Sequence, residues 1–149
     1  MTYESLSIAF ADVKNASVSE VGRIIGGKVQ QNVESGIFNN ACALRLSYAF
    51  NKAGNLIKST DGAVSSGADG KWYLYRVADM EKYLKRITPE KDVLTGNRSS
   101  DFVGKKGIIV FKDCNWVDAS GHVDLYNGGI VEGHDYSLGC NNVFLYLIN

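Results

Sequence analysis

The sequence predicts an α+β fold in which helices come first along the chain and an antiparallel sheet follows. Apolar residues at helical spacing lie before residue 90, whereas strand-like apolar runs and a hairpin signal lie after residue 105. A length of 149 residues without a repeat or a break in composition predicts one domain spanning residues 1–149.

Three segments of the first part predict helices. Ser17 to Ile25 ends at Gly26-Gly27, which is a usual stop signal. Asn39 to Asn51 begins with asparagine, a good N-cap residue, and is rich in Ala and Leu. Its apolar residues recur at helical spacing, so we expect one of its faces to be buried. Val77 to Ile87 shows the same spacing and stops before Pro89.

The segments between these helices are less regular. Lys58 to Gly70 is polar and rich in small residues, which predicts a loop. Trp72 to Tyr75 predicts either a strand or the start of a helix.

Strand-like runs dominate the second part of the chain. These are Gly107 to Phe111, Gly121 to Tyr126 and Val143 to Ile148. Asn127-Gly128-Gly129 after the second run is a strong hairpin signal. An antiparallel sheet is therefore expected to follow the helices.

The composition disfavours two classes of partner. Sixteen basic and sixteen acidic residues give zero formal charge, whereas a nucleic-acid binder normally has a basic excess. The longest purely apolar stretch, Val143 to Ile148, is far shorter than the roughly 20 residues that span a bilayer, so no membrane insertion is expected. The N-terminus has neither a basic region nor an apolar run typical of a signal peptide. We therefore expect a cytosolic protein, or one exported without a cleavable signal.

The three cysteines, at positions 42, 114 and 140, are too few for a disulfide scaffold and lack zinc-site spacing. Cys114 and Cys140 could pair and leave Cys42 free, or both could remain buried thiols. The distance between them decides between these alternatives.

Cys42 and His122 are candidates for nucleophilic catalysis. A cysteine at the start of a helix benefits from the positive end of the helix dipole and from free backbone N–H groups, which favour the thiolate. A histidine within hydrogen-bond reach would complete an activated nucleophile. The alternative is that Cys42 is a small core residue and His122 a structural histidine.

An acid should orient the imidazole, and two candidates follow from strand geometry. Asp124 lies two residues after His122 and hence on the same face of the strand. Asp135 lies on the return arm of the hairpin. A turn centred on Asn127-Gly128 would place Gly133 opposite His122, so Asp135 would need a bulge to reach the ring. Either acid could instead be a solvated strand charge.

Two groups of motifs resemble the fourth family of type VI secretion amidase effectors. Residues 39–51 (NNACALRLSYAFN), preceded by Gly26-Gly27-Lys28-Val29, are similar to the catalytic-cysteine helix of that family. Residues 107–111 (GIIVF), Trp116 and residues 120–128 (SGHVDLYNG) resemble its histidine-bearing hairpin. The resemblance covers roughly residues 20–136.

The resemblance implies a papain-like cysteine amidase of the NlpC type. Such effectors cut the peptide stem of peptidoglycan between D-glutamate and meso-diaminopimelate. Cys42 would map to the nucleophile and His122 to the base, and the Cys42 backbone N–H with a neighbouring donor would hold the oxyanion. The family's acid falls near Gly133 here, so Asp135 or Asp124 must replace it. We favour Asp135, because an acid across the hairpin reaches Nδ1 while Nε2 faces the sulfur.

The resemblance also implies partners and a place of action. An amidase of this kind requires no metal and no organic cofactor. The protein would be made in the cytoplasm, exported by type VI secretion components and active in the periplasm of a target bacterium. A periplasmic immunity protein would block its cleft. The alternatives are a phage or housekeeping cell-wall hydrolase with the same core, or a non-catalytic carbohydrate-binding module that uses its eight Tyr and two Trp for stacking.

Overall fold

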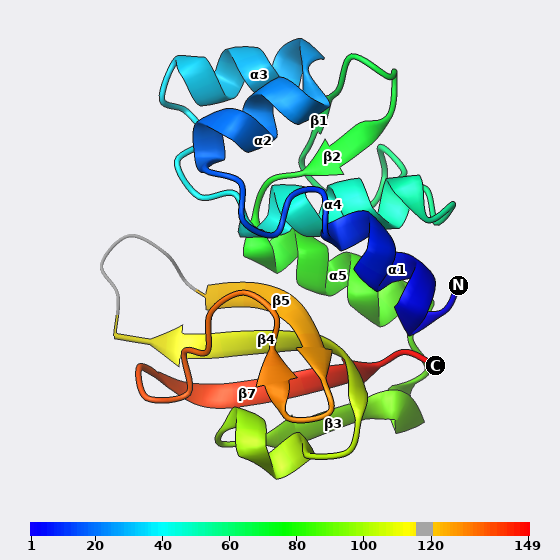
Figure 1. The fold of residues 1–149 in the computed structure, drawn as a ribbon, viewed down its shortest axis with the longest axis vertical. Coiled ribbons are helices and arrows are strands. Elements are labelled where there is room, and N and C mark those ends of the chain that lie inside the picture. Colours follow the sequence, from blue (N-terminus) through cyan, green and yellow to red (C-terminus); the bar gives the residue numbers. More distant parts are fainter. Residues whose placement is uncertain (116–120) are drawn as a thin grey trace.

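Helices and a five-stranded sheet form stacked layers in the computed structural model, which describes residues 1–115 and 121–149. Figure 1 shows α1, α4 and α5 over the sheet, with α2, α3 and a small hairpin on the far side of α4. Trp116 and Ser120, which contribute to the family resemblance, lie outside the described residues. In the described part of the chain, no helix has both the length and the apolar character needed to cross a bilayer.

The helices agree with the sequence predictions at α2, α4 and α5. Their bounds, with those of two helices that were not predicted, are α1 (Tyr3–Phe10), α2 (Val18–Ile25), α3 (Gly27–Glu34), α4 (Cys42–Lys52) and α5 (Val77–Ile87). Helix α5 has the predicted bounds, and Ser17 caps α2. Helix α4 begins three residues later than predicted, because Asn39 and Asn40 belong to the preceding loop and Ala41 is the N-cap. The cysteine is therefore the first residue of its helix.

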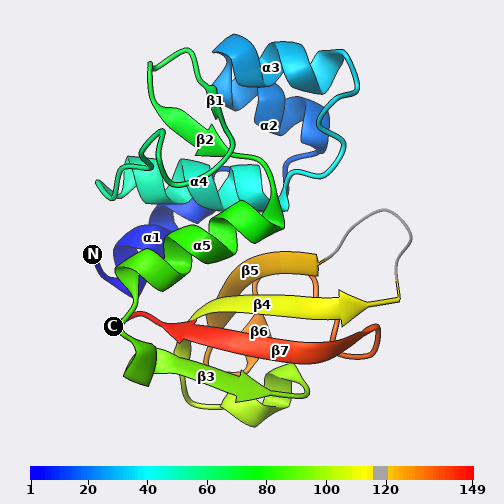
Figure 2. The same ribbon diagram turned by 180° about the vertical axis from the view of Figure 1, so that it is seen from behind.

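The main sheet is antiparallel in the order β3-β7-β4-β5-β6. Its strands are β3 (Val93–Gly96), β4 (Lys106–Cys114), β5 (Gly121–Asn127), β6 (Ile130–Val131) and β7 (Cys140–Leu147). The three predicted runs are β4, β5 and β7, and the predicted hairpin joins β5 to β6. Figure 2 shows β4 between β5 and β7, with β3 at the outer edge.

A second, two-stranded sheet corrects the prediction of a loop over residues 58–70. Strand β1 (Val64–Ser66) lies inside that segment and pairs with β2 (Trp72–Leu74). Strand β2 contacts α4, and Tyr73 and Leu74 are buried. Polar sequence alone predicted a loop, whereas pairing with the aromatic strand β2 makes part of it extended.

The main core lies between the helices and one face of the sheet. Helix α4 contributes Leu46, Ala49 and Phe50, all without exposed surface, as the helical spacing predicted. Val123 and Leu125 of β5 belong to the same core. Burial of a side chain of this kind stabilises the fold by about 1.5–3 kcal/mol. This packing holds the first turn of α4 against β5.

Cys114 and Cys140 form a disulfide bond. They face each other at the ends of β4 and β7, where the register of the two strands pairs them directly. The structure thus places together the two cysteines whose pairing the sequence left open, and Cys42 remains free.

Candidate active site

Cys42 lies at the N-terminus of α4 and is almost completely buried. Its backbone N–H donates to Oδ1 of Asn40 over 3.0 Å. This bond satisfies one of the N–H groups that a helix leaves free at its start. Contact between α4 and β5 brings this end of the helix to the strand that carries the histidine.

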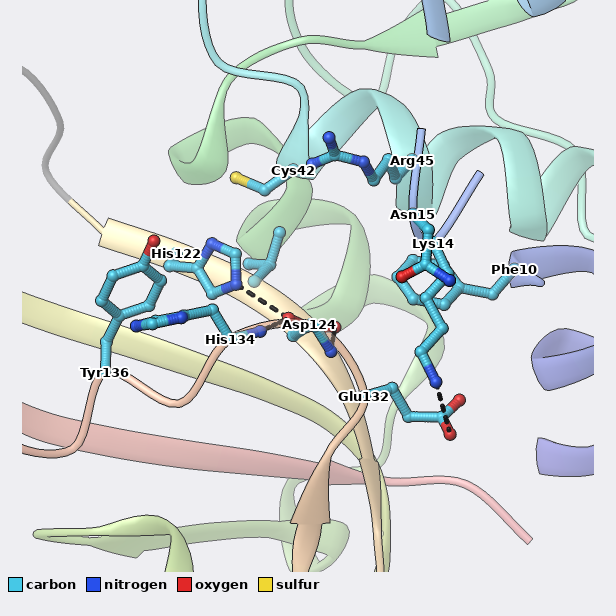
Figure 3. Close-up of a pocket in the computed structure, with 12 residues that line it drawn as sticks. Phe10, Lys14, Asn15, Cys42, Arg45, His122, Asp124, Glu132, His134 and Tyr136 are labelled. Carbon is cyan, nitrogen blue, oxygen red and sulfur yellow. Dashed lines mark hydrogen bonds and ion pairs between the residues drawn. The ribbon is translucent and has the colours of Figure 1, made fainter. Parts of the chain in front are cut away.

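His122 lies on β5, opposite Phe111 of β4. Its ring packs against Tyr136, with the ring centroids 4.7 Å apart. Nε2 bonds to Oδ2 of Asp124 over 2.9 Å, so Nδ1 is the nitrogen left to face Cys42 (Figure 3). The sequence analysis expects the acid at Nδ1 and the sulfur at Nε2, so the structure reverses the two roles.

Burial is the largest influence on the pKa of His122 and lowers it, but two partners reverse the outcome. The hydrogen bond to Asp124 and the interaction with Cys42 together raise the pKa to about 9. The imidazole therefore stays protonated at neutral pH.

Asp124 is buried and accepts hydrogen bonds at both carboxylate oxygens. Oδ1 accepts from the backbone N–H groups of Leu125 and Gly133, at 2.9 and 3.0 Å. Oδ2 accepts from the backbone N–H of His134 at 3.0 Å as well as bonding to His122. The carboxylate therefore has a fixed orientation and holds His122 in turn.

Asp135 does not contact His122, which contradicts the expected hydrogen bond. Its carboxylate accepts hydrogen bonds from Ser99 and Ser137. The reason is that the arm leaves the ladder before it reaches His122. Strand β6 pairs with β5 only through Ile130 and Val131. The N–H groups of Gly133 and His134 then bind the carboxylate of Asp124, so the arm does not place Asp135 beside the ring.

Gly133 allows the arm after β6 to lie against Asp124. A Cβ atom at this position would be 2.1 Å from Oδ2 of Asp124. Only glycine permits this approach of the backbone without movement of the carboxylate or the arm. The backbone at this position thus binds an acid from the neighbouring strand.

Cys42, His122 and Asp124 line one cleft of about 240 Å³. Its helical side is lined by Phe10, Lys14, Asn15, Cys42 and Arg45. Its sheet side is lined by His122, Asp124, Glu132, Gly133, His134 and Tyr136. Figure 3 shows Lys14 and Glu132 together at one end, where Nζ lies 3.7 Å from the carboxylate.

Sequence reasoning missed several lining residues. Arg45 was detectable, because it lies three residues after Cys42 and hence on the same side of the predicted helix. No signal pointed to Lys14, which lies in the loop between α1 and α2. His134 also lines the cleft, and the sequence analysis gave it no role. In the described part of the chain, no three His, Cys, Asp or Glu side chains gather as metal ligands would.

The fold and the site together define a papain-like α+β domain, in which a cysteine at a helix start faces a histidine on an antiparallel sheet. A comparison with protein families matches residues 38–146 to the type VI secretion system (T6SS) amidase effector protein 4 family. The chain belongs to this family. A comparison with curated proteins finds no match.

Solved structures of relatives resemble the whole chain. The Tae4–Tai4 effector–immunity complex from Salmonella Typhimurium includes a chain that is 40% identical, with a TM-score of 0.89 and coverage of 99% of this chain and 98% of that one. The corresponding complex from Enterobacter cloacae gives 34% identity, a TM-score of 0.90 and the same coverage. A Salmonella effector bound to the Enterobacter immunity protein gives 40% identity, a TM-score of 0.87 and again the same coverage.

Proposed function

We propose that this chain is a cysteine amidase that hydrolyses the bond between γ-D-glutamate and meso-diaminopimelate in the peptide stem of peptidoglycan. The observation that carries the proposal is the cleft that contains Cys42, His122 and Asp124 in hydrogen-bonded order. Family membership supports the amidase chemistry. It also favours an effector over a phage or housekeeping hydrolase.

In the first step, the Cys42 thiolate attacks the γ-glutamyl carbonyl carbon and forms a tetrahedral adduct. Protonated His122 then gives its Nδ1 proton to the amine of diaminopimelate as the C–N bond breaks, which leaves a thioester on Cys42. In the second step, His122 takes a proton from water, and the hydroxide formed releases the glutamyl acid from the sulfur. Asp124 keeps the ring oriented through Nε2 in both steps.

The backbone N–H of Cys42 is the oxyanion donor in this mechanism. In the free protein this N–H is bonded to Asn40 Oδ1. We propose that the substrate carbonyl oxygen replaces the Asn40 oxygen on binding. Because Asn40 is exposed, its side chain can move aside without disturbing the core.

The proposal includes delivery and partners. The three solved relatives described above are complexes with immunity proteins. We propose that a related immunity protein covers this cleft in the periplasm of protected cells. Type VI secretion components would deliver the effector to the periplasm of a neighbouring bacterium, where the stem peptides lie. Residues 1–149 would act as one amidase domain without a metal or organic cofactor.

Removal of the thiol tests the proposed nucleophile. Purified peptidoglycan is incubated with the wild type and with Cys42→Ala, and the released fragments are identified by mass. We expect the variant to lose turnover by at least about 1,000-fold, since the acyl acceptor is gone. Circular dichroism checks that the variant folds. Release of fragments by Cys42→Ala at near the wild-type rate would show that another group is the nucleophile.

A further inference from the structure

We infer that Arg45 binds the free α-carboxylate of the γ-linked D-glutamate and so makes the enzyme selective for stems in which this carboxylate is not amidated. This inference rests on the proposed function, because it concerns the residue whose carbonyl is attacked. It adds a specificity determinant beside the groups that carry out the reaction.

The position of Arg45 matches the geometry of a γ-glutamyl substrate. Arg45 and Cys42 are three residues apart on α4 and both line the cleft (Figure 3). Side chains at this spacing lie on the same side of a helix, with Cβ atoms about 5–6 Å apart. In γ-linked glutamate, the α-carboxylate carbon is four bonds from the carbonyl carbon, which is about 5 Å in an extended chain. A substrate attacked by Cys42 therefore brings its carboxylate within reach of Arg45.

The hydrogen bonds of Arg45 leave its charge available. Nε donates to the backbone carbonyl of Val13 over 3.2 Å, and one terminal nitrogen donates to that of Ala16 over 2.7 Å. Both acceptors are neutral. Among residues 1–115 and 121–149, Arg45 forms no ion pair, and its other terminal nitrogen has no hydrogen-bond acceptor.

The remaining charges of the cleft are already paired. Asp124 is bound by His122 and by three backbone N–H groups. Lys14 and Glu132 lie within 3.7 Å of each other. Among the described residues that line the cleft, Arg45 is therefore the cation without a carboxylate partner, and a substrate anion can balance its charge. Hydrogen bonds to two backbone carbonyls hold the guanidinium of Arg45 in place before the substrate binds. This reduces the side-chain entropy that is lost on binding.

Arg45 also holds the loop between α1 and α2, because Val13 and Ala16 flank the cleft residues Lys14 and Asn15. A substitution at Arg45 could therefore lower activity for structural reasons alone. The test needs a measurement that a structural role would leave unchanged. A ratio of two substrates, measured on the same protein sample, meets this requirement because the folded fraction cancels.

The experiment uses three synthetic L-Ala-γ-D-Glu-meso-diaminopimelate tripeptides. One carries both free carboxylates, the second carries an α-carboxamide on the glutamate, and the third carries a carboxamide on the distal carboxylate of diaminopimelate. We expect the wild type to cleave the first at least about tenfold more efficiently than the second, as measured by kcat/KM, because a charge-assisted hydrogen bond is lost. The third should be cleaved like the first. Arg45→Gln should cleave the first and second nearly equally.

Arg23→Gln is the matched control, because it removes an arginine that is exposed on α2 and interacts with Ser19 and Glu20 of its own helix. It should keep the wild-type preference. Equal cleavage of the first and second tripeptides by the wild type would overturn the inference but leave the proposed function intact. Retained preference in Arg45→Gln, or a loss of preference confined to the third tripeptide, would also overturn it. Absence of cleavage of all three by the wild type would count against both proposals.

Discussion

The carboxylate of Asp124 decides how His122 is presented to Cys42. Side chains two residues apart on a strand are about 6.6 Å apart at Cα, so the imidazole must lean along β5 to meet the acid. Nε2 of the imidazole makes the contact with Asp124. Three backbone N–H groups fix the orientation of the carboxylate. The pKa of His122, about 9, reflects this partner together with Cys42.

We expect Asp124→Asn to lower kcat/KM by about 100-fold, because the imidazole loses the acceptor that fixes its orientation and stabilises its charge. The pKa of His122 should also fall below 9, since burial lowers it and one of the groups that raise it is gone. Peptidoglycan turnover and an NMR titration of the His122 ring measure the two effects.

Asp135→Asn is the matched control, because the carboxylate of Asp135 is bound to Ser99 and Ser137 and not to the ring. Turnover should stay within about twofold of the wild type, as for most substitutions outside the reacting groups. The opposite order of effects would assign the orienting role to Asp135.

Among the elements of the fold, the arm after β6 is the one that completes the site. Strand β6 pairs with β5 for only two residues, Ile130 and Val131. The arm then leaves the ladder, and its N–H groups at Gly133 and His134 bind the Asp124 side chain instead of a backbone carbonyl. A short strand followed by this departure brings Glu132, His134 and Tyr136 to the cleft.

Gly133→Ala should lower kcat/KM by about tenfold or more and lower the free energy of unfolding by about 1–3 kcal/mol. The added Cβ displaces the arm from Asp124, so this buried carboxylate loses hydrogen bonds from backbone N–H groups. Turnover assays and denaturant unfolding test the two parts.

The control for this substitution is Ile130→Ala, which truncates an exposed residue of the same hairpin. It should leave turnover unchanged. Wild-type activity in Gly133→Ala would mean that the N–H groups of the arm do not orient the acid.

Across the whole molecule, the site depends on two layers and on a disulfide bond. Figure 1 shows the helices and the main sheet as separate layers. Cys42 lies on α4 and His122 on β5, so the site needs both layers. Cys114–Cys140 joins β4 to β7 close to the start of β5, where Lys112 pairs with Gly121. The chain segment that the bond closes contains the entire histidine hairpin.

We expect the double variant Cys114→Ser/Cys140→Ser to unfold with a free energy lower by about 3 kcal/mol. The bond spans a sequence separation of 26 residues and restricts the unfolded chain, which is the source of this stabilisation in the loop-entropy description. Denaturant unfolding of the oxidised wild type and of the variant measures the difference.

Reduction of the wild type should lower the free energy of unfolding by a similar amount without any substitution. Before reduction, alkylation followed by intact-mass measurement should show that two of the three cysteines are protected. Equal stability of the oxidised wild type and the double variant would show that the bond does not stabilise this fold.

The sequence by itself determined the fold class, the helices at α2, α4 and α5, the strands β4, β5 and β7, and the positions of Cys42 and His122 on them. These features follow from capping and periodicity, which act over a few neighbouring residues. Tertiary structure decided which acid meets His122, which ring nitrogen faces Cys42, that Cys114 meets Cys140, and that Arg45 lines the cleft. Each of these depends on strand register or on contacts between segments far apart in the chain. The departure of the arm from the sheet after Val131 was enough to exchange Asp135 for Asp124.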